Sequence, residues 1–226
     1  SLLLVLDNSY CTPFLQTSSN FGVDCVIYSD SLYLDGQSRI SGGIILGTSK
    51  AIAKIRNFSV ESESGFSSFH AWVLGRGLET LAVRMERHST NALRVAEYLE
   101  KNSVIEKVVY PFLTSHSSHQ VALKQMKFGG GILSFSMQGG VVRGRRFIEC
   151  MKKFANPTDA SIRTSVTHPA STTHLPLPES VRLQLGARSN LIQLSVGLEH
   201  IDDILEEIET AICDSKIVFK LHKKGY

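Results

Sequence analysis

Two short apolar stretches, Leu2-Leu3-Leu4-Val5-Leu6 and Asp24-Cys25-Val26-Ile27-Tyr28, set the expected fold of the N-terminal region. Turn-forming residues bound both stretches, which is the pattern of strands covered on both faces in a parallel sheet. Asp7 follows the first predicted strand and Ser29 follows the second. Because ligands of open α/β sheets gather at the carboxyl ends of the strands, we expect these two polar residues to converge on one ligand.

The next predicted elements continue this α/β pattern. The segment Gly42–Gly47 predicts a further strand, and Ser49 is expected to cap a helix that runs through Arg56. Apolar residues at helical spacing between Leu78 and Leu99 predict one long amphipathic helix. Beyond it, the sequence predicts the strands 104–110, 132–137 and 191–196 and the helices 118–126, 144–153 and 201–213.

The order of these elements predicts two domains. Residues 1–75 form the first α/β domain in this interpretation, and residues 76–226 comprise the long linking helix and a smaller C-terminal α/β domain. The segment 156–178 is rich in Thr, Ser and Pro and predicts an irregular stretch. Such a stretch either carries a site on a rigid scaffold or is an ordinary long connection.

The composition is that of an ordinary globular chain, with 226 residues, 42% hydrophobic content and a formal net charge of +3. Four cysteines lie in apolar segments without CxxC spacing, which favours a reducing, cytoplasmic compartment. The basic cluster Lys216–Lys224 indicates a solvated tail, and the apolar run at the N-terminus is too short to span a membrane. We therefore expect neither nucleic acid nor a membrane as a partner.

Three sequence blocks occur in a characteristic order: Val5-Leu6-Asp7-Asn8-Ser9-Tyr10-Cys11-Thr12-Pro13, Gly75-Arg76-Gly77-Leu78-Glu79-Thr80-Leu81 and Leu194-Ser195-Val196-Gly197-Leu198-Glu199. From about Leu4 to Cys213 the chain resembles the cystathionine synthase and lyase group of pyridoxal-phosphate enzymes of sulfur amino-acid metabolism. Within that group it most resembles the O-succinylhomoserine sulfhydrylases, through Asp35-Gly36-Gln37-Ser38-Arg39 and Val166-Thr167-His168-Pro169-Ala170-Ser171-Thr172-Thr173-His174.

The resemblance implies the C-terminal part of a PLP-dependent aminotransferase-like (fold type I) enzyme. A remnant of the large parallel-sheet domain would be followed by the smaller α/β domain. The reaction implied is a γ-replacement in methionine biosynthesis, in which sulfide replaces the acyl group of O-succinylhomoserine or O-acetylhomoserine and homocysteine forms. The group assembles as homotetramers with sites near subunit boundaries.

The resemblance also implies cofactor-binding residues. Asp7 matches the carboxylate that keeps the ring nitrogen of pyridoxal 5'-phosphate protonated. Ser29 and Ser31 match two hydroxyl positions that bind the cofactor phosphate. Without the resemblance, Asp7 would be interpreted as a turn-former at a strand end and the serines as ordinary loop residues.

Two substitutions set the chain apart from the family it resembles. Leu32 occupies the position of the lysine that forms the Schiff base with the cofactor, and a leucine can neither form an imine nor carry a proton. Gln193 stands where the family places an arginine that grips the substrate carboxylate, so a bidentate charged pair is lost. We therefore expect no catalytic residue at the cofactor, and non-covalent, weak binding of PLP at best.

Other polar residues have a more limited interpretation. Arg163 and Thr164 resemble an Arg-Thr pair in the substrate loop of the sulfhydrylases, so Thr164 is a candidate substrate-binding residue with Gln193. The histidines at 116, 119, 168 and 174 lack a partner Cys, Asp or Glu at metal-ligand spacing, so we expect loop histidines and no metal site.

These observations leave three hypotheses open. The chain is a catalytically silent relative of the sulfhydrylases, or a non-catalytic subunit or scaffold that pairs with an intact homologue, or an active enzyme whose true residue 32 is lysine. Because the chain opens in an apolar strand without an initiator methionine, we also expect a preceding portion to be missing. Its loss would leave an open apolar edge on the sheet.

Overall fold

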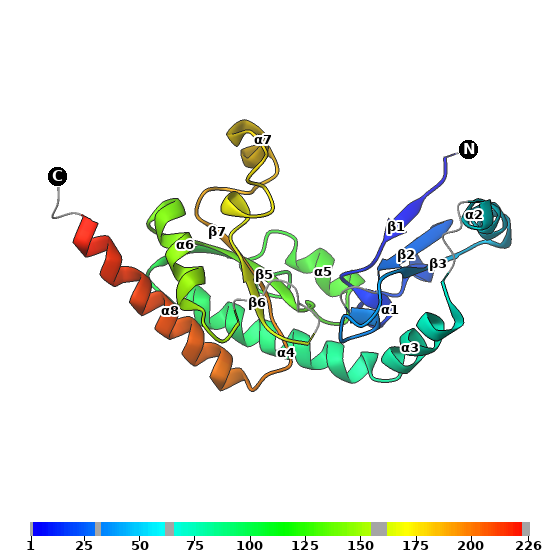
Figure 1. The fold of residues 1–226 in the computed structure, drawn as a ribbon, viewed down its shortest axis with the longest axis horizontal. Coiled ribbons are helices and arrows are strands. Elements are labelled where there is room, and N and C mark those ends of the chain that lie inside the picture. The colour runs from blue at the N-terminus through cyan, green and yellow to red at the C-terminus, as the bar shows by residue number, and fades with distance from the viewer. Residues whose placement is uncertain (1, 30–32, 62–65, 155–161, 223–226) are drawn as a thin grey trace.

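The computed structural model describes residues 2–29, 33–61, 66–154 and 162–222, which form two sheets joined by a long helix (Figure 1). The first sheet has three strands in the order β1-β2-β3, namely Val5–Asp7, Cys25–Ser29 and Gly43–Gly47. Strand β1 runs parallel to β2, whereas β3 runs antiparallel to β2. The three predicted strands are present, and the sheet they form is mixed.

The first sheet is less covered than the sequence predicts. Val5 and Leu46 are 46% and 51% exposed, and Ile27 and Ile45 are also exposed. The expectation that the strands are covered on both faces is therefore wrong for β1 and β3, whereas Cys25, Val26 and Tyr28 of β2 are buried. Helix α2, Ser49–Glu61, lies beside β3 at the end of the molecule away from the second sheet (Figure 1).

Short helical segments connect the strands of this region. They are α1, Thr12–Leu15; the 3-10 turn η1, Ser18–Phe21; and α3, Ser68–Leu78. The expected N-cap of α2 is also corrected, because Thr48 Oγ1 accepts a hydrogen bond of 3.3 Å from the Ala51 amide. Ser49 is already the first residue of the helix.

Helix α4, Leu81–Glu100, connects the two sheets along one side of the molecule (Figure 1). Leu78 is the last residue of α3 and not the start of the long helix. A turn at residues 79 and 80 separates α3 from α4. Leu81 and Met85 pack into an apolar cluster with the first sheet, whereas the stretch from Ala92 to Leu99 packs into a second cluster. The domain boundary near residue 75 stays a prediction.

The second sheet is antiparallel throughout, with the order β4-β5-β7-β6. Its strands are Ile105–Val109, Ile132–Met137, Leu191–Ser195 and Ser165–Thr167, in that order across the sheet. Strand β5 alternates strictly, because Leu133, Phe135 and Met137 are buried while the residues between them are half-buried. One face of this sheet therefore forms the core and the other does not.

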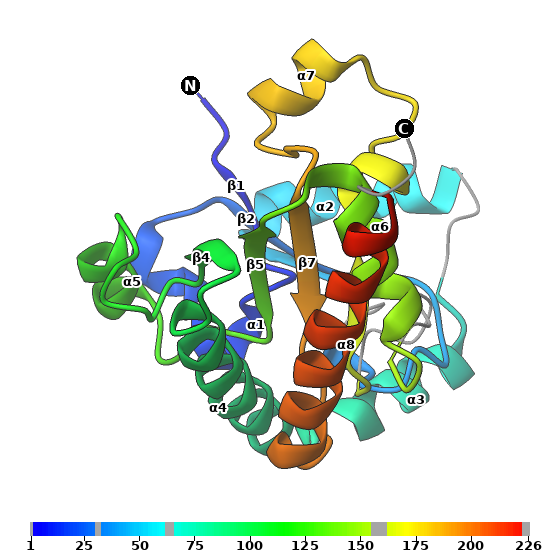
Figure 2. The same cartoon turned by 90° about the vertical axis from the view of Figure 1, so that its left-hand side faces the viewer.

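Helices cover the core face of the second sheet (Figure 2). Helices α4 and α6 contact β5, and α8 packs against both of them. The remaining bounds are α5, His119–Gln125; α6, Gly140–Cys150; η3, Pro169–Ser171; α7, Glu179–Gln184; and α8, Ile201–His222. The predicted irregular segment 156–178 contains β6 and η3 in its described part. No described helix has the length and apolarity needed to cross a membrane.

Candidate functional site

A hydrogen-bonded chain connects Asp7 and Ser29 at the carboxyl ends of β1 and β2. The backbone amide and the hydroxyl of Ser9 donate to Asp7 Oδ1 at 3.0 and 2.6 Å. The Ser29 amide in turn donates to Ser9 Oγ at 2.8 Å. The parallel pairing of β1 and β2 brings the two predicted residues to the same edge of the sheet.

The electrostatics of this edge favour a charged Asp7. The hydroxyl and then the backbone amide of Ser9 lower the pKa of the Asp7 carboxyl below its ordinary value, because both stabilise the ionised form. The side chain is exposed, so the carboxylate can meet a cationic ring nitrogen or solvent. The sequence did not predict the role of Ser9 in this hydrogen-bonded chain. Its position two residues after an aspartate is nevertheless the signal of an Asx-type turn.

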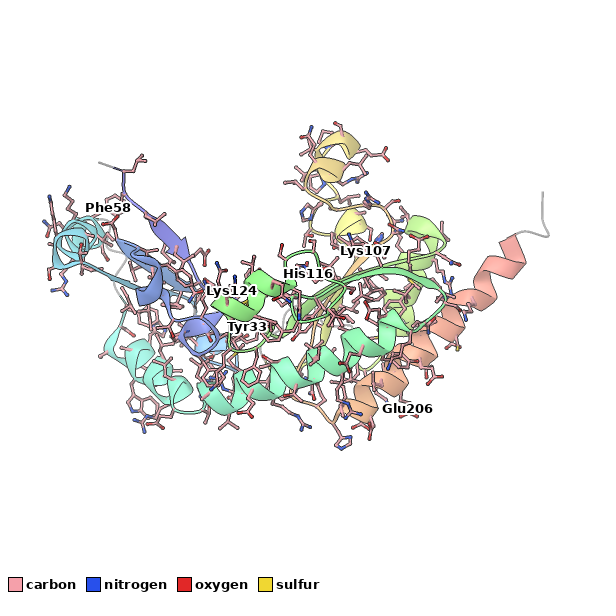
Figure 3. The ribbon with its side chains drawn as sticks, turned by 180° about the vertical axis from the view of Figure 1, so that it is seen from behind. Tyr33, Phe58, Lys107, His116, Lys124 and Glu206 are labelled. Carbon is pink, nitrogen blue, oxygen red and sulfur yellow. The ribbon has the colours of Figure 1, made fainter. Side chains whose placement is uncertain are left out.

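The predicted positions Ser31 and Leu32 lie outside the described residues. The backbone that follows them is held by Arg84 of helix α4, which is 9% exposed. Its Nη1 donates to the carbonyl oxygen of Tyr33 at 2.6 Å, and its Nη2 donates to the carbonyl oxygen of Gly77 at 2.7 Å. Figure 3 shows Tyr33 against α4, near the junction between the two sheets.

An ion pair between the buried Asp35 and the partly exposed Arg39 secures the next turn of the chain. The side chain of Asp35 is fully buried, and its Oδ1 accepts from Arg39 Nη2 and Nε at 2.6 and 2.9 Å. Burial raises the pKa of the Asp35 carboxyl, but the hydrogen bonds and charge of Arg39 outweigh burial, so the pKa lies below its ordinary value. Hydrogen bonds from Arg84 and Arg39 thus hold the chain that follows position 32.

Gln193, predicted as a substrate-binding residue, lines a cavity of about 420 Å³ between the two sheets. One wall is formed by Tyr10 and Cys11, which follow β1. The other lining residues include Gln193 of β7, Ile132 and Ser134 of β5, and the glycines at 129–131. Tyr10 and Cys11, in the loop after Asp7, therefore line the same cavity as Gln193.

Thr164, the other predicted substrate-binding residue, is buried and held by Glu199. Its amide and hydroxyl donate to the two carboxylate oxygens of Glu199 at 2.6 and 2.9 Å, and its Oγ1 accepts from the Gly197 amide at 2.9 Å. Arg163 beside it is exposed. The geometry gives Thr164 a structural role in joining β6 to the turn after β7, and its contact with a substrate stays a prediction.

The remaining candidates do not form a site in the described part of the chain. No group of three or more His, Cys, Asp or Glu side chains there is arranged to hold a metal ion. His168 is buried, with Nδ1 at 2.8 Å from Ser171 Oγ and Nε2 at 2.9 Å from the Ser189 carbonyl oxygen. All four cysteines, Cys11, Cys25, Cys150 and Cys213, are free thiols.

A mixed sheet with polar residues at its carboxyl edge, followed by an antiparallel sheet across a long helix, is the partial α/β fold of a PLP-dependent fold type I enzyme. The family model described as Cys/Met metabolism PLP-dependent enzyme matches residues 1–213. The chain belongs to this family, whose members depend on pyridoxal phosphate.

Similar proteins define the family relationship more closely. The O-succinylhomoserine sulfhydrylase of Pseudomonas aeruginosa is 38% identical over 203 residues, 89% of this chain and 50% of that protein. The L-methionine gamma-lyase of Treponema denticola is 36% identical over 213 residues, 92% and 53% of the two chains. The chain thus spans about half the length of the curated relatives it matches.

Solved structures give the same relationship. Cystathionine gamma-lyase from Lactobacillus plantarum, complexed with L-serine, superposes with a TM-score of 0.89 at 31% identity, covering 95% of this chain and 57% of that chain. Cystathionine gamma synthase from Xanthomonas oryzae, in complex with cystathionine, has a TM-score of 0.89 at 29% identity, with coverages of 95% and 56%.

The residues present do not fit covalently bound pyridoxal phosphate. Asp7 presents an exposed carboxylate suited to a ring nitrogen, and Ser29 lies at the adjacent strand end. Position 32, however, carries a hydrocarbon side chain, which cannot condense with an aldehyde. The cavity lined by Gln193 likewise has no arginine or lysine among its described lining residues.

Proposed function

We propose that this chain keeps the scaffold of a PLP-dependent enzyme of sulfur amino-acid metabolism without the covalent catalysis of its relatives. The observation that carries the proposal is Leu32, because in γ-replacement a lysine amine at this position would hold the cofactor as an imine and then move protons between carbons of the substrate. Gln193 supports it, since a neutral amide cannot form the charged pair that an arginine forms with a carboxylate. The hydrogen bond from Arg84 to the Tyr33 carbonyl oxygen and the Asp35–Arg39 ion pair are consistent with a fold that is retained without catalysis.

A turnover assay tests this proposal. The purified chain is incubated with pyridoxal phosphate, sulfide and O-succinyl-L-homoserine, and in a parallel reaction with O-acetyl-L-homoserine. The P. aeruginosa sulfhydrylase serves as the positive control. We expect no homocysteine above the level of the protein-free reaction, and sulfide-dependent homocysteine formation by the chain would contradict the proposal. Mass spectrometry of the peptide that spans position 32 shows whether residue 32 is leucine or lysine. It therefore tests the hypothesis of an active enzyme whose true residue 32 is lysine.

The exposed apolar surface supports a second candidate function, a non-catalytic subunit or scaffold that pairs with an intact homologue. Phe69 and Trp72 of α3 are 65% and 61% exposed and stack on each other with ring centroids 6.2 Å apart. Val5 and Leu46 add exposed apolar surface on the first sheet. Exposed large apolar side chains of this kind are common at protein–protein contacts.

Trp72 is the only tryptophan in the sequence, which makes the second candidate measurable. The chain is labelled with 5-fluorotryptophan and mixed with the unlabelled P. aeruginosa sulfhydrylase, and the ¹⁹F resonance is followed by NMR. A shifted or broadened resonance together with co-elution in size-exclusion chromatography supports pairing, and Phe69→Arg should weaken it. An unchanged resonance and separate elution would exclude this homologue as the partner.

A further inference from the structure

The cavity between the two sheets has features that the proposed function does not use. It measures about 420 Å³, within the range of about 300–1,000 Å³ that is usual for small-molecule sites. Its lining includes Tyr10 and Cys11 together with Gln193 and Ser134. Apolar side chains, Met126 and others, complete the lining, so the cavity combines an apolar body with a few polar groups.

The strand register places these polar groups on one face of the second sheet. Ser134 lies directly opposite Gln193 across the β5–β7 ladder. Their neighbours Leu133 and Leu194 are buried in the core cluster. Because successive side chains of a strand point to opposite faces, Ser134 and Gln193 point away from that core and toward the cavity. The face of β5 and β7 that carries Ser134 and Gln193 is therefore the face that lines the cavity.

The hydrogen-bonding capacity of this face is not used within the protein. In the described residues, no hydrogen bond engages the side-chain amide of Gln193 or the hydroxyl of Ser134, although both residues are half-buried. Half-buried polar groups normally have a partner, which here is solvent or a ligand. An amide offers one N–H donor and one carbonyl acceptor toward the same side.

The charge of the cavity restricts the ligand further. The described lining residues include no Asp, Glu, Lys, Arg or His. Cys11 is neutral at physiological pH, because burial raises the pKa of its thiol. A carboxylate that entered this cavity would lose water without gaining a cation, which is unfavourable, whereas a neutral polar group would not carry that cost.

We infer that this cavity binds a neutral ligand that presents a primary carboxamide on a short apolar chain. The carboxamide pairs with the Gln193 amide, N–H to carbonyl oxygen in both directions, and the chain lies along the apolar lining. The inference goes beyond the proposed function, since it assigns a ligand class and requires no turnover. Its test is a binding measurement and is independent of the homocysteine assay.

The test compares hexanamide with hexanoate, two probes of the same length that differ in charge at neutral pH. Binding to the purified chain is measured by isothermal titration calorimetry or ligand-detected NMR. We expect hexanamide to bind at least about tenfold more tightly than hexanoate, a difference of about 1.4 kcal/mol. Equal affinities, tighter binding of hexanoate, or no saturable binding of hexanamide would overturn the inference.

Variants at Gln193 separate recognition from folding. Gln193→Arg should reverse the preference, so that hexanoate binds more tightly than hexanamide. Gln193→Leu should lose hexanamide binding by about tenfold while it keeps the circular dichroism and melting temperature of the parent chain. Gln184→Arg, the same exchange at an exposed position of α7, should leave the preference unchanged. If Gln193→Leu binds hexanamide as well as the parent, the inference is wrong.

Discussion

The guanidinium of Arg84 reaches the carbonyl oxygen of Tyr33, 51 residues earlier in the chain, with Nη1 at 2.6 Å. The same side chain donates to the carbonyl oxygens of Leu34 and Gly77 and to Thr80 Oγ1. A single buried cation therefore joins helix α4, the end of α3 and the backbone that follows position 32. This contact fixes the backbone at Tyr33 and Leu34 against helix α4.

Removal of this cation should destabilise the fold. Arg84→Met leaves buried carbonyl groups without donors, and we expect a loss of about 2–4 kcal/mol in the free energy of unfolding. Arg94→Met on the same helix breaks only an exposed ion pair of 3.7 Å and should change stability by less than about 0.5 kcal/mol. Urea unfolding followed by circular dichroism measures both, and equal effects would show that the buried contacts contribute little.

The Asp35–Arg39 pair predicts a specific pH dependence. Burial raises the pKa of Asp35 and Arg39 lowers it by more, so the folded pKa lies below the unfolded value of about 4. The stability that this group contributes is therefore complete above about pH 4 and is lost as the pH falls through the lower folded pKa. Asp35→Asn should reduce stability at pH 7 and flatten the acid limb of the stability curve. Parallel acid limbs in parent and variant would contradict this assignment.

Two helical glycines should respond to alanine with opposite signs. A Cβ at Gly144 would lie 2.9 Å from the ring of His168, which is buried and hydrogen-bonded at both nitrogens. Gly144→Ala should therefore cost about 1–3 kcal/mol through overpacking. A Cβ at Gly75 meets no atom within 4 Å, so Gly75→Ala should stabilise by about 0.5–1 kcal/mol. Melting temperatures measure the signs, and a stabilised Gly144→Ala would show that His168 can move.

Much of the second sheet is predictable from local sequence. Glycines at 129–131 and 139 bound the apolar run of β5, so both of its ends follow from turn chemistry. Helix α3 escapes prediction because Gly75 and Gly77 interrupt its pattern and its aromatic residues face outward. The need for a glycine at position 77 is visible only in the folded structure, because a Cβ there would lie 2.6 Å from the carbonyl oxygens of Leu34 and Asp35.

The candidate site likewise contains residues whose position the sequence predicts and contacts that it does not predict. Strand order predicts that Asp7 and Ser29 lie at one edge, and they are the last residues of the parallel strands β1 and β2. The bridge through Ser9 depends on the exact turn geometry. The contact between Thr164 and Glu199 joins residues 35 positions apart, and no local pattern indicates it. Long-range hydrogen bonds of this kind depend on packing that local periodicity does not encode.

We predict that a lysine at position 32 alone does not give the chain sulfhydrylase activity. In Leu32→Lys the amine is present, but Gln193 still offers no cation to a substrate carboxylate, and its cavity stays neutral. We expect no sulfide-dependent homocysteine from the 226-residue chain carrying this substitution. The double variant Leu32→Lys, Gln193→Arg tests whether the second substitution is the remaining obstacle. Turnover by Leu32→Lys alone would show that Gln193 is tolerated.

We predict that the chain forms no imine with pyridoxal phosphate at position 32. Borohydride reduction of the purified chain in the presence of the cofactor, followed by peptide mass spectrometry, measures this, with the P. aeruginosa sulfhydrylase as the positive control. We predict a stoichiometric pyridoxyl adduct in the control and none in the peptide that contains Leu32, with at most scattered substoichiometric labelling of surface lysines. A stoichiometric adduct at one residue of this chain, abolished when that residue is replaced, would contradict the account.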